Sequence, residues 1–117
     1  MRLEEVVERL SLEVCVGSDK LDRNVTGGYA CDLLSYVMAR AKEGDIWVTI
    51  QNHLNIVAVA SLIGLAGIVV TEGNRPEEPT LEKARTEDVP VFLTSLTTYD
   101  VVGRLYELGV HDAGERR

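Results

Sequence analysis

The sequence predicts one α/β domain whose mainly parallel β-sheet is flanked by helices. Three short apolar segments with the residue types of buried strands begin at Ile46, Ile68 and Val91, which are 22 and 23 positions apart. A helix-like segment separates each strand from the next, and strand–helix–strand units with right-handed crossovers make the strands parallel. The chain of 117 residues has the usual length of a single domain. We therefore expect residues 1–117 to form one three-layer domain.

The N-terminal part predicts a helix followed by a strand. Apolar residues recur at helical spacing over 3–10, with charged residues between them. Residues 12–16 alternate or run apolar, and the polar segment that begins at Gly17 ends this strand.

A second helix and a second strand follow. Asp32 is suited to cap the helix that begins after it, and Gly44 stands just past the end of that helix. The segment Ile46–Ile50 consists of β-branched and aromatic residues, which predicts a strand.

The second half of the chain repeats this alternation. Residues 53–64 are nearly all apolar and long enough for a helix, and residues 67–71 form the kind of apolar strand that parallel sheets bury on both faces. The remaining expected elements are a polar helix over 80–87, a strand over 89–94 and an amphipathic helix over 97–108.

The charge balance limits the partners. The chain has 12 Lys and Arg against 19 Asp and Glu, a formal net charge of -7, and no basic cluster that would suit nucleic acid or an anionic membrane. The longest apolar run, 56–70, is too short to span a bilayer, and the acidic N-terminus does not resemble a signal peptide. We expect a cytoplasmic protein without nucleic-acid or membrane partners.

Polar loops follow the three predicted parallel strands. Each strand ends with a Thr, and the loops at 49–52, 71–74 and 94–97 are expected along one edge of the sheet, where open α/β sheets bind ligands. Two of these loops lead into helix N-termini, whose N–H groups favour anions. Helix capping alone also explains Asn52 and Thr97, so both interpretations stay open.

The first candidate ligand contacts are His53 and its polar neighbours Gln51 and Asn55. No acidic residue or second His lies at metal-ligand spacing from His53, so a neutral imidazole that hydrogen-bonds a ligand or a backbone carbonyl is favoured over a metal site.

The second candidate group lies in the segment 22–28. Arg23 is suited to hold a phosphate or a carboxylate, and it is followed by Thr26, Gly27 and Gly28, whose glycines permit close backbone approach or positive φ. The alternative is a structural loop with a Gly-Gly turn and an Arg–Asp pair. We expect the two groups to form two walls of one concave rim.

The sequence contains no established catalytic motif. It has neither the P-loop pattern G-x-x-x-x-G-K-[ST] nor G-x-S-x-G. Cys15, Cys31 and the two His residues do not show the spacing of a metal site or of a nucleophile with its base. We therefore predict a non-enzyme without a cofactor. A small enzyme that uses His53 with Asp22 or Asp32 as acid and base is the alternative.

Several separated motifs resemble the DRTGG domain family, over about Leu12 to Leu108. The residues that match the family's name are Asp22, Arg23, Thr26, Gly27 and Gly28, here interrupted by Asn24-Val25. The further similar runs, in the family's order, are Asp32–Ser35, Gln51–Ala60 and Val91–Thr94.

This resemblance implies a regulatory module with a fold similar to the N-terminal domain of HPr kinase/phosphorylase. DRTGG domains stand beside catalytic domains in some phosphotransacetylases and, with CBS domains, in regulated pyrophosphatases. In the pyrophosphatases they contribute to dimerisation and lie near an adenine-nucleotide site. The resemblance does not imply kinase activity, because the P-loop domain is missing.

The apolar helix at 53–64 independently indicates a homodimer, since a helix that is apolar all round must be covered on every side. Neighbouring helices are the alternative cover. Our leading hypothesis is a non-catalytic regulatory, ligand-sensing and dimerisation module for a small anionic ligand such as a nucleotide or a phosphorylated metabolite. A protein–protein interaction subunit that regulates a separate metabolic enzyme is the alternative.

Overall fold

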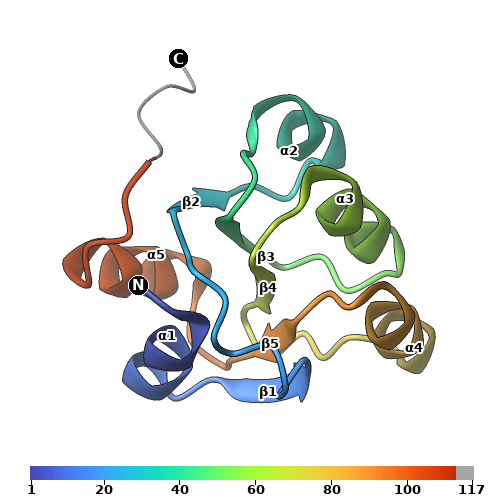
Figure 1. The fold of residues 1–117 in the computed structure, drawn as a ribbon, viewed down its shortest axis with the longest axis horizontal. Coiled ribbons are helices and arrows are strands. Elements are labelled where there is room, and N and C mark those ends of the chain that lie inside the picture. The colour runs from blue at the N-terminus through green and yellow to red at the C-terminus, as the bar shows by residue number, and fades with distance from the viewer. Residues whose placement is uncertain (113–117) are drawn as a thin grey trace.

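The computed structural model has helices packed on both faces of a central sheet, and it describes residues 1–112 (Figure 1). Residues 113–117, the end of the predicted domain, lie outside the described residues. The elements in chain order are α1 (Leu3–Leu10), β1 (Glu13–Val16), β2 (Gly27–Ala30), α2 (Leu34–Arg40), β3 (Asp45–Thr49), α3 (Asn55–Ile63), β4 (Gly67–Val70), α4 (Glu78–Glu87), β5 (Val91–Leu93) and α5 (Thr98–Glu107). Every helix and strand expected from the sequence is present.

The strands form one sheet in the order β1-β5-β4-β3-β2. β2, β3, β4 and β5 are parallel, and β1 pairs antiparallel with β5. Each parallel strand lies beside the preceding one, so the right-handed crossovers place α2, α3 and α4 on the same face of the sheet, while α1 and α5 cover the other face. The prediction of a mainly parallel sheet flanked by helices is confirmed.

The strand β2 was not expected, because the segment 22–28 has the composition of a turn. Gly27 and Gly28 each weaken a strand by roughly 0.5–1 kcal/mol relative to Ala. Neither glycine has a positive φ, and both pair in register with β3, Gly27 with Asp45 and Gly28 with Ile46. Pairing with a fully buried neighbouring strand therefore outweighs the local preference, and the alternative of a Gly-Gly turn is wrong.

The core consists of two apolar clusters, one on each face of the sheet. Trp47 and Ile68 belong to the cluster under α2, α3 and α4, while Ile46 and Phe92 belong to the cluster under α1 and α5. All residues of β3 and β4 are buried, which explains why their sequences run apolar without alternation. Within residues 1–112, no helix is both long enough and apolar enough to cross a membrane.

The connection from β1 to β2 crosses the whole sheet at the amino ends of the parallel strands. A Cβ on Gly17 would lie 2.8 Å from Pro90 Cα, just before β5, and Val25 N–H donates to the Met1 carbonyl at 2.6 Å. The connection finally reaches Gly44, just before β3, because Thr26 N–H donates to the Gly44 carbonyl at 3.0 Å. This amino edge of the sheet is therefore occupied by the chain itself.

Replacing Gly44 with Ala is expected to destabilise the fold strongly. Its φ of +86° costs an L-residue about 1–2 kcal/mol. A Cβ would also lie 2.3 Å from Thr26 Oγ1, which is closer than atoms can approach. Gly73→Ala is the matched control, because Gly73 has a φ of +66° but no atom within 4 Å of the added Cβ. Urea unfolding is expected to show a larger loss for Gly44→Ala, and equal losses would contradict this assignment.

Candidate functional site

The carboxyl ends of β3, β4 and β5 lie along one edge of the sheet, as predicted from the sequence. The loops that leave these strands contact one another directly. Thr71 N–H donates to the Thr49 carbonyl at 3.0 Å, and Gly73 N–H donates to the Thr94 carbonyl at 2.9 Å. We call these three loops, together with Asp32 after β2, the carboxyl edge.

Asp32 organises the part of the carboxyl edge near β2. Its Oδ1 accepts hydrogen bonds from Thr49 Oγ1 at 2.8 Å and from Ile50 N–H at 2.9 Å. The Gln51 side-chain amide donates to the Asp32 carbonyl at 2.9 Å. Asp32 thus holds the loop after β3 rather than acting as the cap of α2, whose N-cap residue is Leu33.

The loop after β3 is also fastened to the loop after β4. The Asn52 amide donates to Asn74 Oδ1 at 3.3 Å and to the Arg75 carbonyl at 3.2 Å, and Thr80 Oγ1 donates to the Asn52 carbonyl at 2.8 Å. Asn52 therefore joins two loops and the first turn of α4. Its predicted alternative role as a helix cap is not seen, because the N-cap of α3 is Leu54 and lacks a side-chain hydrogen bond.

The N-terminus of α5 already holds a carboxylate of the chain. Thr98 N–H donates to Glu72 Oε2 at 3.1 Å, and Glu72 reaches this position from a left-handed backbone conformation with φ 62°. Thr97 caps the helix, as its Oγ1 accepts from Asp100 N–H at 3.1 Å. The capping interpretation of Thr97 is therefore confirmed, and the favourable position for an anion here is filled by Glu72.

A polar cavity of about 420 Å³ opens on the carboxyl edge beside this helix. We call it the edge cavity. The residues that line it are Ser11, Glu13, Gly73, Arg75, Leu93, Thr94 and Ser95. The charged groups of this cavity are the Arg75 guanidinium and the Glu13 carboxylate, and hydroxyl groups line the remaining polar part. The guanidinium suits an anionic ligand that takes the place of Glu13.

Arg75 makes a two-pronged ion pair with Glu13 of β1. Its Nη1 and Nη2 donate to the Glu13 carboxylate at 3.0 and 2.8 Å. This hydrogen bonding lowers the pKa of Glu13 and raises the pKa of Arg75. Both side chains are more than half exposed, so water screens the pair and its contribution to stability is small. The pair therefore links β1 to the loop after β4 through a contact in which another anion can replace Glu13.

The predicted contacts Gln51, His53 and Asn55 lie at the carboxyl edge on the α3 side of the loop after β4. His53 Nδ1 lies 3.3 Å from Glu77 Oε1, and its side chain is exposed. Asn55 is the first residue of α3 and is also exposed. The imidazole at this edge therefore also lies beside a carboxylate.

The other predicted contacts lie at the opposite end of the strands. Arg23 Nη2 donates to the Asp88 carbonyl at 3.0 Å, Thr26 Oγ1 donates to the Glu43 carbonyl at 3.3 Å, and Gly27 pairs with the first residue of β3. The length of β3, at about 3.3 Å per residue, separates this group from His53. The expectation of one concave rim within a single chain is therefore wrong. Gly28 faces a different cavity, between β2 and α5.

Sequence reasoning missed Arg75 and Glu13, the two charged residues of the edge cavity. Arg75 lies four positions after Thr71, at the end of a predicted apolar strand. This position in a loop at the carboxyl edge was the signal that could have identified it. Glu13 carried no signal, because only the antiparallel pairing of β1 with β5 brings it to the carboxyl ends of the other strands.

Within residues 1–112, no group of three or more His, Cys, Asp or Glu is placed to hold a metal ion. Cys15 and Cys31 are free, and burial raises the pKa of the Cys15 thiol, which makes it a poor nucleophile at neutral pH. The carboxylate beside His53 belongs to Glu77, and not to Asp22 or Asp32.

Comparison with known proteins identifies the family. The DRTGG domain model matches residues 5–108. The chain is also similar to a crystal structure of the CBS and DRTGG domains of the regulatory region of Clostridium perfringens pyrophosphatase, complexed with the activator diadenosine tetraphosphate. The TM-score is 0.68 at 15% identity, and the likeness covers 98% of this chain and 49% of that chain, so this chain spans about half of its neighbour. No curated protein matches the sequence. The resemblance of the separated motifs is thereby confirmed, and the chain belongs to the DRTGG domain family.

Proposed function

We propose that this protein is a regulatory module that senses a small anionic ligand, such as a nucleotide, in the edge cavity. The observation that carries this proposal is the exposed pair of Arg75 and Glu13 at the wall of that cavity. A guanidinium binds phosphate with the same two-pronged geometry that it uses for a carboxylate. A phosphate group can therefore take the place of Glu13.

The exchange has a structural consequence, because Glu13 and Arg75 belong to different parts of the sheet. Their ion pair ties the edge strand β1 to the loop that precedes α4. A ligand that binds Arg75 in place of Glu13 releases β1 from this loop. It also hydrogen-bonds the hydroxyl groups of Thr94 and Ser95. Binding is thereby coupled to the position of an edge strand, where a partner domain can respond to it.

The contacts on the α3 side extend this proposed site. Gln51, His53 and Asn55 lie across the loop after β4, and we include them as contacts for a part of the ligand that reaches beyond the edge cavity. Ligand binding by Arg23, Thr26 and Gly27 at the amino edge stays a prediction, separate from this site.

The structural neighbour supports a nucleotide as the ligand class. That protein is the regulatory region of a pyrophosphatase, and it is complexed with the nucleotide activator diadenosine tetraphosphate. This chain matches about half of that regulatory region, which belongs to a metabolic enzyme. Regulation of a metabolic enzyme is therefore part of the proposal.

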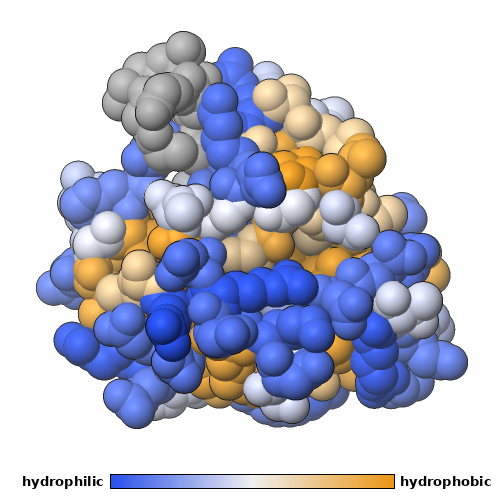
Figure 2. Space-filling model, viewed as in Figure 1, coloured by the Kyte–Doolittle hydropathy of each residue, from blue (hydrophilic) through white to orange (hydrophobic). Residues whose placement is uncertain are grey.

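We also propose that the module forms a homodimer through an apolar surface on α2 and α3. The α2–α3 face consists of the exposed side chains Leu33, Tyr36, Met38, Leu54 and Leu62. Figure 2 shows apolar residues gathered over these two helices, at its upper right. The segments 33–39 and 46–71 contain no Asp, Glu, Lys or Arg, although the chain has a net charge of -7. Two copies can therefore meet here with little charge repulsion.

One part of the apolar surface of α3 is thus buried within its own domain, and in this proposal the second copy covers the rest. Ile56, Val57 and Ala60 are buried in the domain, but Leu62 is 72% exposed. The same face also favours the alternative function, an interaction subunit that binds a metabolic enzyme directly, because an apolar surface of this kind fits either partner.

ATP and tripolyphosphate are expected to raise the melting temperature of the wild-type protein. A ligand that binds only the folded state stabilises it by about 2.7 kcal/mol at a hundredfold excess over Kd. Arg75→Gln is expected to remove this shift, and Glu13→Gln is expected to tighten binding, because it frees Arg75 from its competitor. Thermal shift and calorimetric titration measure both effects.

The control for this experiment is Arg85→Gln, which removes another exposed guanidinium that is paired with a carboxylate, here that of Glu78 at 3.5 Å. This variant is expected to bind like the wild type. A wild-type protein that none of ATP, AMP and tripolyphosphate stabilises would contradict the sensing function. Unchanged binding in Arg75→Gln would show that the edge cavity is not the site.

Sedimentation at micromolar concentration is expected to show a dimer for the wild type and a monomer for Leu62→Glu. The substitution places a charge in the middle of the apolar contact, where it has no partner. Tyr99→Glu is the matched control, because Tyr99 is 92% exposed on α5, outside the α2–α3 face. A wild-type monomer, or a dimer that Leu62→Glu leaves intact, would rule out this interface.

A further inference from the structure

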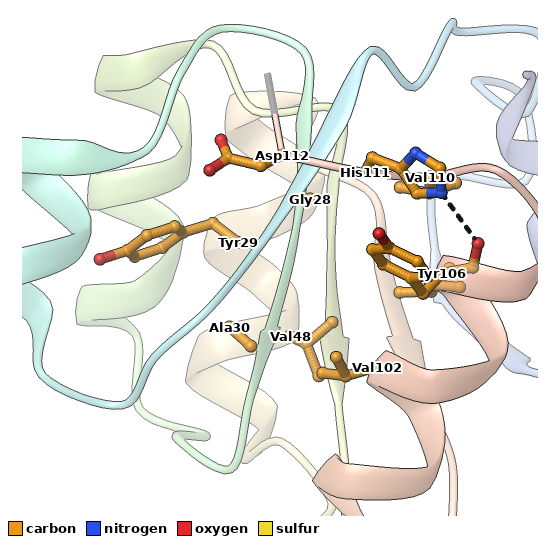
Figure 3. Close-up of a pocket in the computed structure, with 10 residues that line it drawn as sticks. Gly28, Tyr29, Ala30, Val48, Val102, Tyr106, Val110, His111 and Asp112 are labelled. Carbon is orange, nitrogen blue, oxygen red and sulfur yellow. Dashed lines mark hydrogen bonds between the residues drawn. The ribbon is translucent and has the colours of Figure 1, made fainter. Parts of the chain in front are cut away.

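A second cavity, of about 220 Å³, lies between β2 and α5, on the face of the sheet that α1 and α5 cover (Figure 3). Its floor is formed by Gly28, Ala30 and Val48, and its opposite wall by residues of α5 and the segment after it, Val102 and Val110 among them. Tyr29, between the two small residues of β2, packs partly against the cluster on the opposite face of the sheet. The strand therefore turns the small residues Gly28 and Ala30 toward the cavity.

Nothing in the fold requires a glycine at position 28. Gly28 does not have a positive φ, so an L-residue is compatible with its backbone. A Cβ added there would meet Val110 Cγ1 at 3.4 Å and Ile46 Cγ2 at 3.7 Å, which are ordinary contact distances. Glycine inside a strand weakens it, and it often marks a place where a ligand approaches the backbone closely. The missing side chain at Gly28 therefore indicates space kept for a ligand.

Two of the α5 side chains that border this cavity remain accessible. Val102 and Tyr106, one turn apart, are 39% and 63% exposed. The Tyr106 ring pairs with the His111 ring at a centroid distance of 4.1 Å and an interplanar angle of 31°, and His111 Nε2 lies 3.1 Å from the Tyr106 carbonyl oxygen. This contact fixes two aromatic rings at the mouth of the cavity, where another ring can stack or meet them edge-on.

The charges around the cavity restrict its ligand further. Among the described residues that line it, none is Lys or Arg. This lining therefore offers no cation to an anionic group, in contrast to the edge cavity with Arg75. The walls are apolar, so the ligand must also be apolar over most of its surface.

We propose that the cavity between β2 and α5 binds a flat aromatic ring that carries no negative charge. Gly28 and Ala30 form the floor under the ring, Val48 and Val102 contact its edge, and Tyr106 covers it from the solvent side. This site is separate from the edge cavity, because no residue lines both. The proposal therefore does not rest on nucleotide sensing.

An NMR titration of the amide resonances with indole-3-carboxamide tests this site. We expect the amide signals of Gly28, Ala30 and Val110 to shift. Indole-3-carboxylate differs from this probe mainly in its negative charge. Its Kd is expected to be higher by about tenfold or more. The absence of shifts at these amides with millimolar carboxamide would overturn the proposal, and equal binding of both probes would overturn its charge selectivity.

Gly28→Val is expected to abolish carboxamide binding while keeping or raising the melting temperature, since a β-branched residue favours a strand and fills the cavity. Val102→Phe fills the same space from α5 and is expected to have the same effect on binding, should Gly28→Val fail to fold. Gly103→Ala is the control, because its Cβ would meet no atom within 4 Å and Gly103 does not line the cavity. Wild-type binding in both filling variants would overturn the site.

The two proposed sites can fail independently in the same titration. ATP is expected to shift the amides of Gly73 and Ser95 at the edge cavity, and indole-3-carboxamide those of Gly28 and Ala30. Loss of the first response contradicts nucleotide sensing and leaves the second site standing, whereas loss of the second response contradicts only the aromatic site.

Discussion

The arrangement of the molecule depends on the burial of β3 and β4 from both faces. Every residue of the two strands is buried, and their register pairs Trp47 with Ile68 and Val48 with Val69. Side chains alternate between the two faces, so a slip by one residue would move Trp47 out of its own layer and leave its indole N–H without the Cys31 carbonyl, which it now contacts at 2.9 Å. The register is fixed for this reason, and the loops that leave both strands are fixed with it.

The two edges of the sheet have different roles because the chain fills only one of them. The connection from β1 to β2 runs along the amino edge, where Arg23, Thr26 and Gly44 make structural contacts with the starts of β3 and β5. The carboxyl edge is free of such a crossing segment. Its polar groups satisfy one another, and the exposed side chains of Arg75 and His53 lie beside the carboxylates of Glu13 and Glu77.

Glycine serves two different purposes in this chain. Gly44 is required by its backbone, since its φ is +86° and a Cβ would collide with Thr26. Gly28 is required by neither its backbone nor its packing, although it costs the strand stability. The contrast separates a glycine that the fold needs from one that lines the proposed aromatic site. Gly28 lies in the segment that carries the family's signature residues, and Gly44 contacts that segment through Thr26.

Local pattern determined most of the secondary structure, because apolar periodicity and cap residues record which side of each element is buried. It also determined the parallel strands β3, β4 and β5 and the shared edge of their loops. The sequence could not reveal β2, because Gly27 and Gly28 favour a turn locally and form a strand only through pairing with β3. It could not place Arg23 and His53 at opposite ends of the strands, or bring Glu13 to Arg75 across 62 positions. Those outcomes depend on strand order and direction, which arise from contacts between distant segments and not from local residue preferences.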